Sequence, residues 1–322
     1  AAGFAQLAML WVATRRANMK LRLQRPRYTP AVRRLVQLGV PGVIAGGIAQ
    51  INLVISTAFA SMQDGAAPWL YYADRVYQLP LGIIGVAIGI VLLPELSRQL
   101  RAGDEKAVDE SQNRSLEFAL FLTIPAAIAL MAFPRPIIQV LFERGAFGAA
   151  DTSASAFALG AFAIGLPAFV LIKLFSPGFF AREDTKTPMY FAGIGVAVNV
   201  VLAFVLFRYL NHIGVALAVS AAAWVNAGLL GITLTRRGFY KTDQRLRTNL
   251  FKILFNSVLM GVFLLVANNY LSPLFSSQTS LIIRVLLLAA MVATGMIIYF
   301  AASHFSGAFR WRDFKQAFRR AK

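Results

Sequence analysis

Long apolar segments, each about as long as a bilayer core is thick, constrain this chain more than any other feature. A bilayer-spanning helix needs about 20 predominantly apolar residues at a rise of about 1.5 Å each. The 322-residue chain contains one shorter apolar segment and eight of roughly that length, and 58% of its residues are hydrophobic. A water-soluble core could not bury so much apolar surface. We therefore predict an integral membrane protein.

The apolar segments predict helices, because they are too long for barrel strands and do not alternate strictly between polar and apolar residues. The expected fold class is an all-α polytopic membrane protein. The polar, mixed-charge segment 98–114 is expected to be a surface helix or a linker. The expected spans are a stub at 1–13, followed by 35–61, 69–95, 115–133, 152–175, 188–209, 213–235, 250–271 and 280–304.

Basic residues divide unevenly between two alternating sets of connections. Of the 32 Lys and Arg, 26 lie in 14–34, 98–114, 176–187, 236–252 and 305–322. The opposite set of helix ends holds Arg135, Arg144, Arg208 and Arg284. By the positive-inside rule the larger set is cytoplasmic, and so is the C-terminus. The basic segments RRANMKLRLQRPR and FRWRDFKQAFRR then set topology and attract anionic membrane lipids, and no nucleic-acid partner is predicted.

The residue types needed for redox or metal chemistry are scarce. The chain has no cysteine and two histidines, His212 and His304, which lie far apart in the sequence. Neither histidine has a second histidine or a carboxylate at helical ligand spacing. The sequence therefore predicts no metal site, no cofactor and no catalytic residue.

The span 69–95 carries two charges side by side, Asp74 and Arg75. A charge near the centre of a membrane helix costs at least about 2.5 kcal/mol, so such charges are usually functional. Neighbouring residues on a helix point about 100° apart, so this pair is poorly placed to form an ion pair with itself. A structural ion pair with no ligand remains the alternative interpretation.

Arg75 shares one helical stripe with other polar and small residues. Tyr71, Arg75 and Gln78 are spaced four and three residues apart, and the stripe continues as Gly82, Gly85 and Gly89. Arg75 lies about 9 Å below the outer end of the span 69–95, and a guanidinium at this depth implies a protein-lined polar cavity. Its planar fork binds phosphate through two hydrogen bonds and keeps its charge when desolvated. The candidate substrate-binding residues are Arg75, Asp74, Gln78 and Tyr71, and the expected ligand is an anionic, phosphorylated lipid or solute.

Other polar residues within or beside the spans allow two interpretations each. Lys173, near the inner end of its span, is an interfacial anchor or part of a gate or interface. Arg284 is expected to reach the outer headgroups. The interhelical or cation-binding candidates are Asn52, Asn199 and Asn226. The candidates for gate ion pairs, or for a solvated turn, are Arg182, Asp184 and Lys186.

Two motifs resemble the MurJ (MviN-type) family of lipid II flippases, within the superfamily of multidrug and oligosaccharidyl-lipid exporters. They are YYADRVYQLPLGIIGVAIGIVLLPELS at 71–97 and PGFFAREDTKTP at 177–188. In the second motif, Thr187 can cap a helix that Pro188 opens. The resemblance implies that Arg75 is the functionally important arginine of the second lobe. Gln78 stands where some members have an acidic residue, so an ion pair is not expected there.

The same resemblance implies fourteen helices, arranged as two six-helix lobes around a central cavity and two accessory helices. Residues 1–34 would end a preceding transmembrane helix and continue as a basic linker. Residues 35–235 would be the second lobe. Residues 236–322 would hold a linker, the accessory pair and a basic tail. The chain begins AAGFAQLAML, without an initiator Met or a basic signal region, so a missing N-terminal lobe of the same protein is expected.

The implied function is a flippase in the bacterial inner membrane, which carries lipid II, an undecaprenyl diphosphate-linked precursor, to the outer leaflet by alternating access. It would serve peptidoglycan biosynthesis, with the polyprenyl tail held by the accessory pair. The alternatives are an exporter of another polyprenyl-linked glycan, a cation-coupled drug exporter and a membrane enzyme acting on polyprenyl phosphates. An enzyme needs clustered carboxylates or histidines. Within the spans only Asp74 is acidic, apart from Glu95 and Glu117 at cytoplasmic ends, so no enzyme is predicted.

Overall fold

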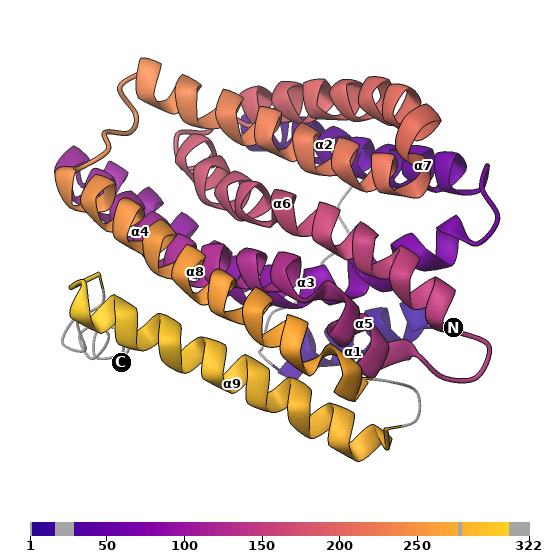
Figure 1. Cartoon of the computed structure of the whole chain (residues 1–322). Helices are drawn as coiled ribbons and strands as arrows, with labels where there is room; N and C mark the ends of the chain where they lie inside the picture. The colour runs from indigo at the N-terminus through magenta and orange to yellow at the C-terminus, as the bar shows by residue number, and fades with distance from the viewer. Residues whose placement is uncertain (1, 17–28, 276–278, 309–322) are drawn as a thin grey trace. The chain divides into compact units, whose positions relative to one another are not determined.

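The computed structural model describes residues 2–16, 29–275 and 279–308, without the side chains of residues 2, 31, 35, 38, 45, 49, 53 and 86–90 (Figure 1). Every regular element in these described ranges is helical, which confirms the all-α fold class. The elements are α1 (Ala2–Arg16), α2 (Pro30–Ala60), α3 (Ala66–Arg101), α4 (Glu105–Ala132), α5 (Pro134–Phe142), α6 (Ala149–Phe180), α7 (Lys186–Arg236), α8 (Gln244–Leu271), the 3₁₀ turn η1 (Ser272–Phe275) and α9 (Leu281–Phe305).

Six candidate membrane spans occur among the described residues, judged by length and apolar composition. They fall on α2, α4, α6, α7, α8 with its 3₁₀ extension, and α9. α3 is not one of the six, but it is a single helix of 36 residues that contains the predicted span 69–95. At about 1.5 Å per residue it is about 54 Å long, enough to cross a bilayer.

The chain divides into two compact units, Ala1–Val40 and Pro41–Lys322. The first holds α1 and the start of α2, and the second holds the remaining helices. The predicted domain boundaries at 34/35 and 235/236 stay predictions. The basic segment 15–27 lies mostly outside the described residues, and the segment 309–320 lies wholly outside them.

α6 is the central helix of the second unit and packs against α3, α4, α5 and α7 (Figure 1). Small residues allow the close approach to α7. A Cβ added at Gly165 would lie 2.9 Å from the Cα of Ser220 on α7. The hydroxyl of Ser220 donates a 2.7 Å hydrogen bond to the carbonyl of Ala161. Small residues and interhelical hydrogen bonds are the usual means by which membrane helices pack.

α7 is two antiparallel arms joined by a kink. Asn211, with φ 51° and ψ −135°, breaks the helix between the predicted spans 188–209 and 213–235. Gly214 makes the turn possible, because an added Cβ would lie 2.5 Å from the carbonyl oxygen of Leu206. The amide of His212 donates a 3.0 Å hydrogen bond to Gln63 Oε1, which ties the turn to the α2–α3 connection.

α8 and α9 form a pair that packs mainly through α8 on α4 (Figure 1). The hydroxyl of Tyr299 on α9 donates a 2.7 Å hydrogen bond to the carbonyl of Phe121 on α4. The buried residues of α9 form one narrow stripe, and large apolar side chains elsewhere on the helix are exposed. Ile282, Leu286 and Ile297 are 73%, 63% and 66% exposed. Such a surface suits lipid contact.

Two connecting regions differ from the sequence prediction. Segment 98–114 is neither a surface helix of its own nor a linker, because α3 continues to Arg101 and α4 begins at Glu105. The side chain of Asp104 caps α4 by accepting a 3.0 Å hydrogen bond from the amide of Ala107. The short helix α5 was not predicted. Pro134 at its first position is the local signal that could have indicated it.

Candidate functional site

The face of α3 that carries Arg75 is turned away from the packed core. On the opposite side Ala73 and Val76 are buried, and the ring of Tyr77 stacks on Phe162 with centroids 5.4 Å apart. The side chains of Tyr71, Arg75 and Gln78 are exposed, as their common helical stripe predicts. Gly82 continues this face, and a Cβ added there would meet nothing within 4 Å. Gly89, at the end of the stripe, lies outside the described side chains.

Arg75 forms no salt bridge or hydrogen bond with an acid among the described residues, although its charge acts on the neighbouring Asp74. Its guanidinium lies over the ring of Tyr71, 4.7 Å from the centroid. Asp74 instead accepts a short hydrogen bond from Gln78 Nε2, four residues later on the helix. The prediction that Asp74 and Arg75 pair poorly is thus consistent with these contacts. The donors of Arg75 remain available to an anionic ligand.

Lys173 of α6 reaches across to the inner end of the same stripe. A Cβ added at Gly85 would lie 2.5 Å from Lys173 Cδ and 2.8 Å from its Nζ. The lysine stem therefore lies over the α3 backbone, and the anchor and gate interpretations of Lys173 both stay predictions. Gly85 is ten residues after Arg75, about 15 Å along the axis. The face thus carries one cation near each end.

The three asparagines are only partly brought together. Asn199 Nδ2 donates hydrogen bonds of 2.7 Å to Asn52 Oδ1 and 3.3 Å to the hydroxyl of Ser56, which links α7 to α2. This geometry is that of an interhelical contact. Asn226 lies beside Gly195 on the other arm of α7. Within the described ranges, the buried side-chain oxygens of Asn199 and Asn226 accept no hydrogen bond.

Asp184 organises the predicted cytoplasmic end of α7. It accepts hydrogen bonds of 3.0 and 2.6 Å from the amide and hydroxyl of Thr187 and one of 2.7 Å from Arg237 Nη1. Asp184, not Thr187, therefore provides the cap, and Pro188 follows inside the first turn. Burial opposes ionisation of Asp184, but the hydrogen bonds from Thr187 and Arg237 together outweigh it and hold its pKa below the usual range.

Arg182, in the connection between α6 and α7, contacts two other segments. Its Nη2 lies 3.1 Å from Glu105 Oε2 at the start of α4, and its guanidinium lies 4.4 Å from the ring centroid of Phe239. Lys186 is exposed and is not drawn into these contacts. Of the three gate candidates, Arg182 and Asp184 hold segments together, which is the geometry that a gate or a fixed interface requires.

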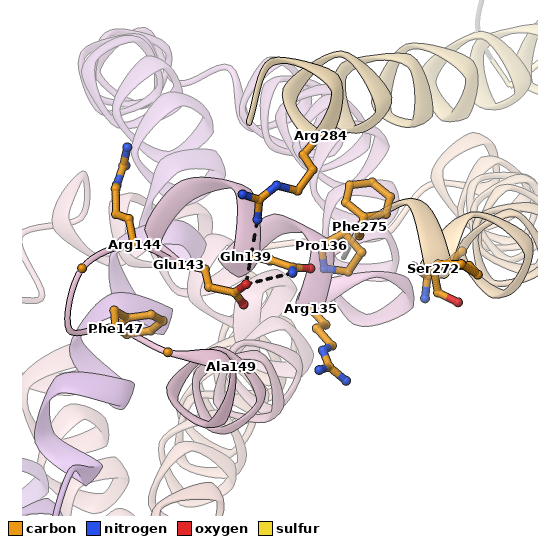
Figure 2. A pocket seen from close by; sticks show the side chains of 14 residues that line it. Arg135, Pro136, Gln139, Glu143, Arg144, Phe147, Ala149, Ser272, Phe275 and Arg284 are labelled. Atoms are coloured by element: carbon orange, nitrogen blue, oxygen red, sulfur yellow. Dashed lines mark hydrogen bonds and ion pairs between the residues drawn. The ribbon is translucent and has the colours of Figure 1, made fainter. Parts of the chain in front are cut away.

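The position of Arg284 differs from the sequence prediction. The residue was expected to reach the outer headgroups, and this expectation is wrong because it is only 8% exposed. It points toward Glu143, with Nη1 3.8 Å from Oε1, inside a pocket between α5, α8 and α9 (Figure 2). No local sequence signal links these residues, which lie 141 positions apart.

No group of three or more His, Cys, Asp or Glu that could hold a metal ion occurs in the part of the chain that the structure describes. No residue of the α3 stripe lines the pocket in Figure 2, so the cavity expected around Arg75 stays a prediction.

A family profile and two relatives that match this chain in sequence name the same family. The sequence profile of a family described as "Lipid II flippase MurJ" matches residues 1–304. A "Probable lipid II flippase MurJ" of Rhizobium meliloti (strain 1021) is 50% identical over 303 residues, covering 94% of this chain and 57% of that protein. The protein of the same description from Rickettsia prowazekii (strain Madrid E) is 34% identical over 304 residues. The alignment covers 94% of this chain and 60% of that protein. The chain thus spans a little over half the length of these relatives.

Solved structures show the same similarity. One described as "Lipid II flippase MurJ, inward closed conformation" matches with a TM-score of 0.67 and 28% identity, over 90% of this chain and 57% of that chain. A MATE transporter in its bent conformation matches with a TM-score of 0.57 and 15% identity, over 88% of this chain and 68% of that chain. The second similarity concerns the fold alone.

Proposed function

Because this chain belongs to the MurJ family of lipid II flippases, we propose that it helps to move a polyprenyl diphosphate-linked peptidoglycan precursor across the inner membrane. The observation that carries this proposal is Arg75. It is an exposed guanidinium within a helix of membrane-spanning length, and no acid among the described residues forms a salt bridge with it. A charge so placed suits a transported anion.

The α3 face would bind the headgroup. The planar fork of Arg75 matches the oxygens of a diphosphate, and the ring of Tyr71 supports the guanidinium from one side. Gln78 donates a hydrogen bond to the carboxylate of Asp74, which forms no hydrogen bond with Arg75 in the described part of the chain. Lys173 supplies a second cation about 15 Å further along α3, toward the cytoplasm in the predicted orientation. These residues form one wall of the translocation path, within a lobe of residues 35–235.

The polyprenyl tail would stay in lipid beside α8 and α9. The exposed apolar side chains on these helices, such as Phe255 at 70% and Leu286 at 63%, offer a surface suited to an isoprenoid chain. The net result is a polar headgroup on the α3 face and an apolar tail outside the lobe. This arrangement would let the headgroup cross without drawing the tail through a polar cavity.

The other functions considered fit the α3 face less well. A drug exporter for cations would place acidic groups where this chain has Arg75 and Lys173. An exporter of another polyprenyl-linked glycan would use the same diphosphate chemistry, so it remains the second candidate. A membrane enzyme would need acid–base or metal groups close together.

Reconstitution of the full-length protein into vesicles with labelled lipid II tests the proposal. Translocation should expose the headgroup to an impermeant reagent, and the recovered lipid should be chemically unchanged, because the chain only moves it. Chemical turnover of the lipid would instead establish an enzyme. Equal translocation of a polyprenyl diphosphate that carries an unrelated glycan would favour the broader exporter.

The orientation is tested by cysteine labelling, which the cysteine-free chain permits. Cysteines introduced at Ala102 and Lys241 should resist an impermeant thiol reagent in intact cells, because the charge distribution places both on the cytoplasmic side. A cysteine at Asp64, on the opposite side, is the matched control and should react. Ready labelling at Ala102 and Lys241 together with protection at Asp64 would reverse the orientation and place the C-terminus outside.

A further inference from the structure

A polar pocket lies where α5, the end of α8 and the start of α9 meet (Figure 2). Its volume is about 900 Å³. It is separate from the α3 stripe and, by the charge distribution, lies at the non-cytoplasmic end of the helices. No step of the proposed transport uses it.

The pocket gathers the scarce basic residues of that end. Of the four arginines on the non-cytoplasmic side, three line the pocket: Arg135, Arg144 and Arg284. Basic residues are depleted on this side of membrane proteins, so the presence of three around one cavity is not a topology signal. Arg284 points toward Glu143, whereas Arg135 and Arg144 are exposed and point away from Arg284 (Figure 2). Among the described lining residues Glu143 is the one acid. The pocket therefore carries excess positive charge.

Glu143 forms an ion pair with Arg284 but accepts no hydrogen bond from it. Its carboxylate accepts a hydrogen bond of 3.0 Å from Gln139 Nε2 (Figure 2). It also accepts one of 2.8 Å from the hydroxyl of Thr152. It approaches Arg284 Nη1 only to 3.8 Å, beyond hydrogen-bonding distance. The carboxylate is thus held mainly by neutral donors on α5 and α6.

Arg284 is the group that points to a ligand. It is more than nine-tenths buried, yet its Nε and Nη1 have no hydrogen-bond partner in the described part of the chain. The buried Oδ1 of Asn268, another lining residue, also lacks one. Buried polar groups are nearly always hydrogen-bonded, and charged ones above all. A bound anion with several oxygens would satisfy the guanidinium.

We propose that this pocket binds a phosphate group on the non-cytoplasmic side of the membrane, supplied by a phospholipid headgroup or by free phosphate. Arginine is the preferred partner of phosphate because its planar fork donates two parallel hydrogen bonds. The bound group would bridge α5 of the lobe and α9 of the accessory pair.

Lipid retention measured by native mass spectrometry tests this site. The full-length protein from nanodiscs of phosphatidylglycerol should retain that lipid more strongly than phosphatidylcholine from matched nanodiscs. Arg284→Gln should reduce retention about tenfold or more, because a charged hydrogen-bond partner is lost. Arg135→Gln, an exposed position that should not disturb folding, should also reduce it. Arg208→Gln, the one outer arginine away from the pocket, is the control and should not.

The two sources are separated by thermal unfolding in detergent. If free phosphate is the ligand, millimolar inorganic phosphate should raise the melting temperature of the wild type but not of Arg284→Gln. If a headgroup is the ligand, added phosphatidylglycerol should do so and phosphate should not. The proposal is overturned if folded Arg135→Gln behaves like the wild type and Arg208→Gln in both measurements. That outcome means equal retention of phosphatidylglycerol and an equal melting temperature with either ligand.

Discussion

Arg75→Ala should abolish transport of the lipid-linked precursor while leaving the protein folded. The substitution removes the cation that we assign to the diphosphate, it breaks no salt bridge among the described residues, and Asp74 keeps its hydrogen bond from Gln78. It also removes the cation–π pair with Tyr71, so the free energy of unfolding should fall by no more than about 1 kcal/mol. Transport and thermal unfolding should be measured on the same preparations.

Arg75→Lys separates charge from geometry. It should retain part of the transport activity, because an ammonium supplies charge without the planar fork. Arg208→Ala is the matched control, since Arg208 is also an exposed arginine over an aromatic ring, 4.8 Å from the centroid of Phe204. This control removes an equivalent cation–π pair and should transport normally. If the loss of thermal stability in Arg75→Ala accounts for its loss of transport, and a stabilising substitution elsewhere restores transport, Arg75 has a structural role.

Gly214→Ala should destabilise the fold at the turn of α7. The added Cβ would lie 2.5 Å from the oxygen and 2.6 Å from the carbon of the Leu206 carbonyl, which is backbone and cannot move alone. Overpacking of this kind costs about 1–3 kcal/mol. We expect a lower melting temperature in detergent and a loss of transport that follows the loss of folded protein.

Gly228→Ala, on the second arm of the same helix, is the control. A Cβ added there would meet nothing within 4 Å. Because alanine favours a helix over glycine by about 1 kcal/mol, this variant should be as stable as the wild type or more so. Equal stability of the Gly214 and Gly228 variants would show that the α7 turn is not closely packed.

Features encoded within one helix were predictable from sequence. The break in the apolar run near Asn211 predicted two spans, and the structure places a kink at that residue. The mutual geometry of Asp74 and Arg75 followed from the 100° step between helix neighbours, and Gln78, four residues on, lies within hydrogen-bonding reach of Asp74.

Features that depend on two helices were not predictable. The stem of Lys173 could have extended to the membrane surface, and only the packing of α6 on α3 places it over Gly85. Arg284 looked like a residue that snorkels to the headgroups, and the position of α5 encloses it instead. Long side chains have too many rotamers for their direction to be fixed by their own helix.

Direct binding of the precursor to purified full-length protein tests the assignment of Arg75 most directly. Affinities for lipid II should be compared for the wild type, Arg75→Ala and Arg208→Ala under the same ionic conditions. We predict that Arg75→Ala weakens binding about tenfold or more, because a hydrogen-bonded charge pair is lost, and that Arg208→Ala does not. Equal affinity of the wild type and a folded Arg75→Ala variant would contradict the account.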